Sequence, residues 1–263
     1  MVIPIHDRNP LRRTPVVTFA LVVLNVVFFL MSPVSTSQGE AAPCRQAAFL
    51  DQYAAVPAEL THNRQLTRVP TGEVRAVHGQ TIVCATGKPS YGKSPFLSVL
   101  YAMFLHAGWL HLLGNMLCLW IFGNNVEDRF GRLRFLVFYL FCGYVAAYGF
   151  ALADPNSTTP LLGASGAIAG VLGAYLIMFP RARVWVLVPF LLFIPLLLPA
   201  WFVLGGWFLL QWLYSAGHTG SDVGGVAYLA HVVGFIAGAV IALFVRAASP
   251  DPRRYSIDGR PSW

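Results

Sequence analysis

Residues 223–245 read VGGVAYLAHVVGFIAGAVIALFV, a run of 23 residues without a charged side chain. About 20 apolar residues in a helix cross the hydrocarbon core of a bilayer, so this run predicts a membrane-spanning helix. It carries one imidazole, His231, and two glycines four residues apart, Gly234 and Gly238. An ionisable side chain inside a membrane is costly, and it therefore requires a functional hypothesis.

Five further uncharged runs of similar or greater length precede this one along the chain. They cover residues 16–39, 94–126, 135–153, 155–180 and 184–221. The last of these contains Pro189, Pro195 and Pro199, so we expect an irregular first part and one span near residues 197–215. The sequence therefore predicts an all-α polytopic membrane protein, a bundle of six transmembrane helices with no room for a second domain.

The composition of the 263-residue chain agrees with this class. Hydrophobic residues make up 56% and charged residues only 11%, whereas soluble domains carry roughly 25% charged residues. A disordered chain, a nucleic-acid-binding protein and an ordinary cytosolic enzyme are therefore excluded as first hypotheses. The net charge of +7 is explained by membrane orientation, because basic residues collect in short cytoplasmic loops.

The distribution of arginine and lysine predicts that both termini are cytoplasmic. With that orientation, twelve of the 18 basic residues lie inside, and the short outer loops 154–162 and 216–225 contain none. We expect a cytoplasmic tail at 1–14, a six-helix domain at 15–246 with a long outer loop at about 33–95, and a cytoplasmic tail at 247–263. The first apolar run is interpreted as a retained span, because five remaining spans after signal cleavage would be unusual.

The cysteines leave one question open and suggest no metal site. Cys44 and Cys84 share the long outer loop, where an oxidising exterior permits a disulfide, but two free thiols fit the sequence as well. Cys118 and Cys142 lie in predicted spans. The sequence has no CxxC, no HExxH and no paired carboxylate within a span, so neither a metal nor a cofactor is expected.

Besides His231, few strongly polar side chains fall within the predicted spans. His106, His111 and Asn115 open the second span, and Ser165 lies near the start of the fourth. The second, fourth and sixth spans all enter from the outer face under the predicted topology. Since a helix rises 1.5 Å per residue, we expect His111, Asn115, Ser165 and His231 to lie at a similar depth below the outer face. His106, beside a tryptophan, is interpreted as interfacial.

Small residues on two of these spans predict close helix packing. Gly166 and Gly170 form a GxxxG pattern on the fourth span, and Gly234 and Gly238 form another on the sixth. Such patterns let two helix backbones approach closely. This approach would bring the hydroxyl of Ser165 within hydrogen-bond reach of the imidazole next to the second pattern.

A serine beside a histidine base has the chemistry of an activated nucleophile. Backbone N–H groups at the helix start near Ser165 would stabilise a developing oxyanion. Taken singly, each residue also has a structural interpretation: a serine in a Gly/Ala-rich helix usually packs, and a membrane histidine often relays protons. These residues alone therefore leave a hydrolase and a proton-coupled transporter as alternatives.

Three motifs in this chain resemble the rhomboid family of intramembrane serine proteases. Residues 106–115 carry its HxxxN at His111 and Asn115, residues 163–166 read GASG for its GxSG, and residues 230–234 read AHVVG for its AHxxG. Residues 123–131, GNNVEDRFG, resemble the family's turn after the second span. GxSG alone also occurs in soluble hydrolases, but all three motifs in order, each in its expected span, are specific.

The resemblance implies a role for each matching residue. Ser165 would be the nucleophile and His231 the general base, without an acidic third member. His111, Asn115 and the backbone N–H of Ser165 would form the oxyanion hole. The glycines would shape the site and pack the helices: Gly163 and Gly166 at the site, and Gly170, Gly234 and Gly238 between helices.

The resemblance also implies hydrolysis of peptide bonds in or near the transmembrane segments of other membrane proteins. The partners are then substrate helices and the lipid bilayer, with no cofactor, metal or nucleic acid, and the location is a bacterial plasma (inner) membrane. The fifth span and loop 216–225 would gate and cover the site.

Two positions depart from the family pattern. Leu97-Ser98 stands where many members have Trp-Arg, and Ala169 stands where some members have a tyrosine that supports the catalytic histidine. A catalytically silent rhomboid-like protein that binds client helices is the first alternative, although such relatives usually lack the serine or the histidine. A transporter would carry a second polar cluster toward the cytoplasmic half, and the sequence contains none.

Overall fold

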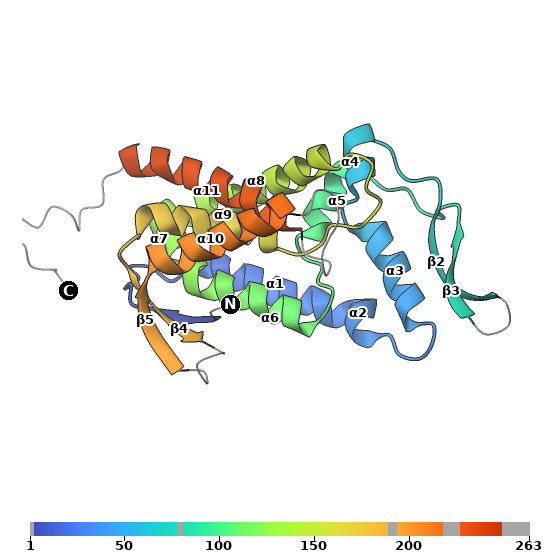
Figure 1. The fold of residues 1–263 in the computed structure, drawn as a ribbon, viewed down its shortest axis with the longest axis horizontal. Helices are drawn as coiled ribbons and strands as arrows, with labels where there is room; N and C mark the ends of the chain where they lie inside the picture. Colours follow the sequence, from blue (N-terminus) through green and yellow to red (C-terminus); the bar gives the residue numbers. More distant parts are fainter. Residues whose placement is uncertain (1–2, 78–80, 189–193, 218–226, 249–263) are drawn as a thin grey trace, which may run out of the picture.

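The computed structural model describes residues 3–77, 81–188, 194–217 and 227–248. Its longer helices run side by side along the long axis of the molecule (Figure 1). A three-stranded sheet lies at one end, called here the sheet end, and a β-hairpin projects at the other, called the hairpin end. These two ends provide the frame in which the functional residues are placed.

Four helices lie in the first, third, fourth and sixth predicted runs. They are α1 (Val16–Met31), α8 (Arg132–Ala153), α9 (Ser165–Met178) and α11 (Tyr228–Ala248). Helices α8 and α11 are each long and apolar enough to cross a membrane, and α1 and α9 are shorter apolar helices. Helix α9 is enclosed by its neighbours, since every residue from Ala167 to Tyr175 is buried.

The second predicted run is divided into several helices. Helix α5 (Pro95–Ala102) begins at Ser94, whose hydroxyl accepts a hydrogen bond from the backbone of Leu97. After a non-helical stretch come α6 (Trp109–Cys118), the π-helical turn η1 (Leu119–Gly123) and α7 (Asn124–Phe130). His106 therefore lies before the helix that carries His111 and Asn115, because Gly108 holds an extended conformation immediately before α6.

The described part of the proline-containing run 184–221 forms two strands and a helix. These are β4 (Arg183–Val188), β5 (Ile194–Pro199) and α10 (Ala200–Gly217), and β1 (Ile3–Asp7) completes an antiparallel sheet in the order β1-β4-β5. Val184, Val186 and Val188 alternate inward along β4, as strand geometry requires. The chain is thus largely helical but not all-α, and the expected tail 1–14 contributes a strand.

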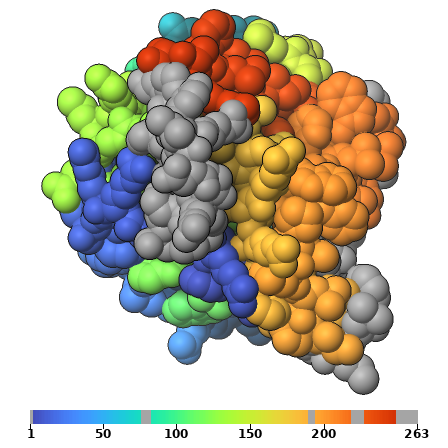
Figure 2. Space-filling view, turned by 90° about the vertical axis from the view of Figure 1, so that its left-hand side faces the viewer, coloured from blue at the N-terminus to red at the C-terminus, as the bar shows by residue number. Residues whose placement is uncertain are grey.

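The sheet end brings together segments that are distant in the sequence. Figure 2 looks onto this end, where N-terminal residues in blue lie on one side and the β4–β5 region with α10 in orange lies on the other. Asp7 of β1 accepts hydrogen bonds from Asn125 of α7 (2.8 Å) and Tyr175 of α9 (2.7 Å). Burial raises the pKa of Asp7, and these two hydrogen bonds partly oppose the rise.

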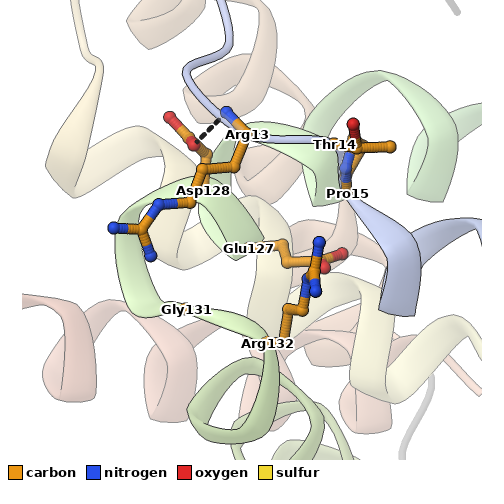
Figure 3. Close-up of a pocket in the computed structure, with 7 residues that line it drawn as sticks. All are labelled: Arg13, Thr14, Pro15, Glu127, Asp128, Gly131 and Arg132. Atoms are coloured by element: carbon orange, nitrogen blue, oxygen red, sulfur yellow. Dashed lines mark hydrogen bonds between the residues drawn. The ribbon is translucent and has the colours of Figure 1, made fainter.

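Carboxylates of α7 bind the start of α1 at the same end. Glu127 accepts hydrogen bonds from the backbone of Val17 (3.0 Å) and from the backbone and hydroxyl of Thr18 (both 2.7 Å). These bonds satisfy N–H groups that a helix start leaves free. Asp128 accepts from the backbone of Arg13 at 3.0 Å beside a cavity of about 290 Å³ (Figure 3).

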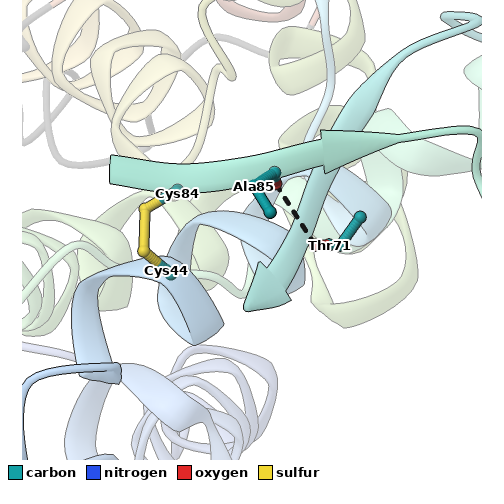
Figure 4. Close-up of a disulfide and its surroundings, with 4 residues drawn as sticks. All are labelled: Cys44, Thr71, Cys84 and Ala85. Carbon is teal, nitrogen blue, oxygen red and sulfur yellow. Dashed lines mark hydrogen bonds between the residues drawn. A yellow bond between two sulfur atoms is a disulfide. The ribbon is translucent and has the colours of Figure 1, made fainter. Parts of the chain in front are cut away.

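The long outer loop is folded. It contains α2 (Pro33–Thr36), α3 (Ala42–Tyr53), α4 (Pro57–His62) and the antiparallel hairpin of β2 (Val69–Val77) and β3 (Thr81–Gly87). A disulfide joins Cys44 of α3 to Cys84 of β3 (Figure 4), with a Cα–Cα distance of 5.1 Å. The free-thiol alternative is therefore wrong for this pair.

A buried polar cluster attaches the outer loop to the helical domain. The carboxylate of Glu59 in α4 is fully buried and pairs with Lys93 Nζ at 2.6 Å, just before α5. Tyr91 donates a hydrogen bond to the carboxylate of Asp51 in α3 (3.0 Å). Burial raises the pKa of Asp51, against the opposing effects of Tyr91 and Lys93. The cluster therefore connects α3, α4 and the chain entering α5.

Candidate active site

Ser165 and His231 lie in direct contact. Ser165 is the first residue of α9, and His231 lies in the first turn of α11. A hydrogen bond of 2.8 Å joins Ser165 Oγ and His231 Nε2, although 66 positions separate the two residues in the chain. The first turns of α9 and α11 thus lie next to each other and place the Ser165 hydroxyl beside the His231 imidazole.

This contact is possible because glycines on α9 and α11 carry no side chains and let the two helix backbones touch. A Cβ added at Gly234 would collide with the carbonyl oxygen of Gly166, and one at Gly238 would collide with the carbonyl oxygen of Gly170. Sequence reasoning missed Gly173, where an added Cβ would collide with the carbonyl oxygen of Phe235. Helix α9 therefore meets α11 at Gly166, Gly170 and Gly173, along about two helical turns.

The same helix also packs tightly against α8. A Cβ at Gly166 would lie 2.7 Å from Ala146 Cβ, and one at Gly170 would lie 2.6 Å from Cys142. Real Cβ atoms essentially never show such distances, so larger residues at these positions would force the helices apart. The close packing of α9 with both neighbours fixes the position of Ser165.

The loop before Ser165 is held by hydrogen bonds to two other segments. Gly163 donates from its backbone N–H to the carbonyl of Ala102 at 2.8 Å, and Leu161 pairs with Ala55 through two backbone hydrogen bonds of 3.2 and 2.6 Å. Gly163 has φ +108°, which favours glycine. A Cβ there would also lie 2.7 Å from His111 Nε2.

His111 and Asn115 face this loop from α6. They are separated by four residues, so they share one face of the helix. A Cβ at Gly163 would lie 3.5 Å from Asn115 Nδ2, a distance that places the amide beside the loop. Asn115 is 8% exposed, and its Nδ2 has no hydrogen-bond partner among the residues that the structure describes. A buried donor of this kind can receive a negatively charged oxygen.

His106, interpreted from the sequence as interfacial, is buried within the protein. The residue is only 2% exposed, and its ring lies 5.1 Å from that of His111 in an edge-on arrangement. Within the described part of the chain, neither ring nitrogen of His106 has a hydrogen-bond partner. His106 therefore packs behind His111, because the non-helical stretch before α6 folds inward.

Helix α10 holds the other side of the imidazole, which sequence reasoning did not anticipate. Gln211 Oε1 lies 2.7 Å from His231 Nδ1, and the ring of Trp207 lies 5.9 Å from the imidazole. Trp207 thus lies against the His231 ring. Ala169, which stands where some rhomboids have a tyrosine, is too small to support this ring. Gln211 is the one amide side chain in residues 200–217, and that isolated polar group was the available signal.

The described residues bring a serine hydroxyl, an imidazole and hydrogen-bond donors together in one place. The first N–H groups of α9 have no acceptor within their own helix, so they add backbone donors next to the hydroxyl. In the described ranges, no group of three or more His, Cys, Asp or Glu side chains could hold a metal ion. Residues 218–226, which include most of the expected covering loop 216–225, lie outside the described residues.

A family model for the Rhomboid domain matches residues 93–248. The chain belongs to the rhomboid family. It is therefore a helical membrane protein of a family that includes serine proteases. The match covers α5 to α11 and all three sequence motifs.

Individual relatives agree with the family assignment. The chain is 30% identical over 173 residues to "Rhomboid protein 1, mitochondrial" of Saccharomyces cerevisiae, covering 64% of this chain and 47% of that protein. It is 35% identical over 157 residues to "Rhomboid-like protease 5" of Toxoplasma gondii, covering 57% and 16%. It is 42% identical over 78 residues to "Rhomboid protease GluP" of Bacillus subtilis, covering 30% and 15%.

The matches span at most about half the length of these relatives. One of the names is mitochondrial, so family membership establishes a membrane protein without specifying which membrane. Activity, substrate and location in this chain are therefore matters for proposal.

Proposed function

We propose that this rhomboid is an intramembrane serine endopeptidase that uses Ser165 as nucleophile and His231 as general base. The observation that carries the proposal is the 2.8 Å hydrogen bond between Ser165 Oγ and His231 Nε2. A serine hydroxyl becomes nucleophilic when an adjacent base removes its proton. Close glycine packing of α9 on α11 supports the proposal further, because it keeps the two groups in reach without any acidic third residue.

The proposed reaction proceeds through an acyl-enzyme. Ser165 Oγ attacks the carbonyl carbon of the scissile peptide bond while His231 Nε2 takes the hydroxyl proton. The C–N bond then breaks, and the imidazolium returns this proton to the leaving amine. Water attacks the ester in the second half, again with His231 as base, and releases the carboxylate product.

The developing oxyanion would be bound by donors that converge beside Ser165. We assign this role to Asn115 Nδ2, to His111 and to the backbone N–H of Ser165. The unpartnered amide of Asn115 supports the assignment, because a donor without a neutral partner stabilises charge that forms only during the reaction. Gly163 would keep space for the substrate carbonyl beside His111 by carrying no side chain, and Gly166 would shape the site by letting α9 pack closely on α8.

The topology belongs to the same proposal. We propose six membrane crossings, formed by α1, α6–α7, α8, α9, α10 and α11, with the sheet end in the cytoplasm of a bacterium and the chain in its plasma membrane. Basic residues gather at this end, where Arg8 bonds β4, Arg13 bonds Asp128 and Arg246 bonds the end of α9. This gathering follows the rule that basic residues lie inside. Ser165, at the opposite end of α9, would lie toward the outer face.

Substrates are expected to be transmembrane segments that enter from the bilayer. Large apolar side chains of α10 are exposed, including Trp201, Phe202 and Trp212, and this supports contact with lipid or with a substrate helix. Peptide carbonyls in an intact helix are hydrogen-bonded, so cleavage would favour segments with helix-weakening residues near the cut.

Reconstitution with a fluorescently tagged transmembrane substrate tests the proposed function. Wild-type protein in liposomes should cleave it, and Ser165→Ala should reduce cleavage to the background of empty liposomes. Ser157→Ala, which removes a hydroxyl from the outer loop before Gly163, is the matched control and should cleave like wild type. Binding of the substrate without any cleavage by wild type would contradict the proposal and favour a catalytically silent, client-binding rhomboid.

A further inference from the structure

We propose that Gln211 is a positioning residue for His231, and that the base is competent only while α10 rests against α11. This inference extends the proposed function by assigning a third group to the Ser–His pair. It depends on one contact, the 2.7 Å approach of Gln211 Oε1 to His231 Nδ1. Gln211 would touch neither substrate nor the reacting atoms.

The contact determines which imidazole nitrogen carries the proton. An amide oxygen only accepts hydrogen bonds, so His231 Nδ1 must donate to Gln211 Oε1. A neutral imidazole with a proton on Nδ1 has a free electron pair on Nε2, the nitrogen that faces Ser165 Oγ at 2.8 Å. Gln211 therefore favours the tautomer in which His231 can accept the serine proton.

A second side chain of α10 fixes the plane of the same ring. Trp207 precedes Gln211 by four residues and so lies on the same face of α10. Its ring centroid is 5.9 Å from that of His231, with an interplanar angle of 34°. One helix thus supplies both the acceptor for Nδ1 and an aromatic surface for the ring.

The part of α10 that carries these residues is held mainly by side-chain contacts. Its buried residues, Ala200, Val203 and Leu204, all lie near the start of the helix. Beyond them, α10 contacts α11 through Phe208 stacked on Phe235, at 4.6 Å, and through Tyr214 stacked on Tyr228, at 5.1 Å. A small outward movement of this half would separate Gln211 from the imidazole, so opening for substrate entry would release the base until α10 returns.

The surroundings of His231 leave few other groups that could orient it. Among the described residues, Ser165 contacts it from α9, Gln211 and Trp207 contact it from α10, and His111 of α6 interacts with it electrostatically. No carboxylate within the described ranges forms a salt bridge or hydrogen bond with the ring. The neutral amide of Gln211 therefore takes the place that an acid occupies in serine triads.

The tautomer can be measured without any activity. Full-length protein carrying ¹⁵N-histidine should show His231, assigned by comparison with His231→Ala, with a protonated Nδ1 and an unprotonated Nε2. Gln211→Leu, which keeps the side-chain size but removes the acceptor, should convert this signal to a mixture of tautomers. An unchanged tautomer in folded Gln211→Leu would overturn the inference.

Rates of fluorophosphonate labelling as a function of pH supply the second readout. Gln211→Leu should label roughly tenfold more slowly than wild type, the scale of one lost buried hydrogen bond. Gln211→Glu restores an acceptor and should regain the labelling rate at high pH. The acidic limb of its pH profile should move to higher pH, because a carboxylate stabilises the imidazolium. Leu213→Ala, an exposed position on the next part of α10, is the matched control and should label like wild type.

These outcomes separate the inference from the proposed function. Equal labelling of wild type and Gln211→Leu at every pH, or failure of Gln211→Glu to restore the rate, would overturn the role of Gln211 and leave the Ser–His chemistry in place. Absence of labelling in wild type, together with the expected tautomer change, would contradict the protease while supporting the positioning contact.

Discussion

Helices α9 and α10 both reach His231 on α11, but they pack against α11 in different ways. Helix α9 meets α11 backbone to backbone, through glycines at which an added Cβ would overlap a carbonyl oxygen. Helix α10 meets α11 through aromatic side chains and one amide. The first contact joins the two helices backbone to backbone, and the second joins them through side chains alone.

Under the proposed function, the two contacts would serve different purposes in the site. A nucleophile and its base must keep a fixed separation, because small errors in geometry cost large factors in rate. A site that admits a helix from the bilayer also needs one element that can yield. The α9–α11 contact would meet the first requirement, and the α10–α11 contact would meet the second while still orienting the proposed base.

The largest effect on stability is expected from disrupting the backbone contact between α9 and α11. Gly238→Val would place a branched side chain against the carbonyl oxygen of Gly170, so the two helices would have to separate. We expect a loss of at least about 3 kcal/mol in the free energy of unfolding, measured by thermal or denaturant unfolding in detergent. A folded Gly238→Val protein with wild-type stability would show that the helices do not pack as described.

The next largest effect is expected on the rate of cleavage, when the hydrogen-bond donor that α6 presents beside Ser165 is removed. Asn115→Ala should lower kcat by about 10²–10³, the usual cost of removing one oxyanion-hole donor, with little change in KM. The measurement is steady-state cleavage of a transmembrane substrate in liposomes. A change confined to KM would instead assign Asn115 to substrate binding.

The contact between α9 and α11 could be predicted from the sequence, and the contact between α10 and α11 could not. The GxxxG patterns and the three motifs predicted the backbone contact of α9 and α11, because small residues and fixed spacing are visible in one chain. Gln211 was missed because its role depends on which way α10 is turned toward α11, and an apolar run does not reveal this. The strands β1, β4 and β5 were also missed, since a short apolar run with prolines predicts irregularity as readily as a strand.

Removal of the disulfide should affect stability more than catalysis. Cys44→Ser removes a link between positions 40 residues apart, a change expected to cost about 2–4 kcal/mol in the stability of the outer loop. Proteolysis of this loop should accelerate, while labelling of Ser165 should change little, because Glu59–Lys93 and Ala55–Leu161 still hold the loop to the domain. Loss of labelling would show that the outer loop helps to position Gly163.

The smallest effect is expected on the α10 side. Gly205→Ala fills open space in a helix and should stabilise the protein by about 0.5–1 kcal/mol through reduced flexibility of the unfolded chain. The same unfolding measurement as for Gly238→Val provides a direct contrast between the two contacts. A destabilising Gly205→Ala would mean that this position of α10 is closely packed against a neighbour, contrary to the open space around it.

Fluorophosphonate labelling of purified, detergent-solubilised protein tests the central claim, that Ser165 is activated by His231. We expect covalent labelling of wild type at Ser165 and no labelling above background in folded Ser165→Ala or His231→Ala. Labelling of His231→Ala at the wild-type rate, or none in folded wild type, would contradict it.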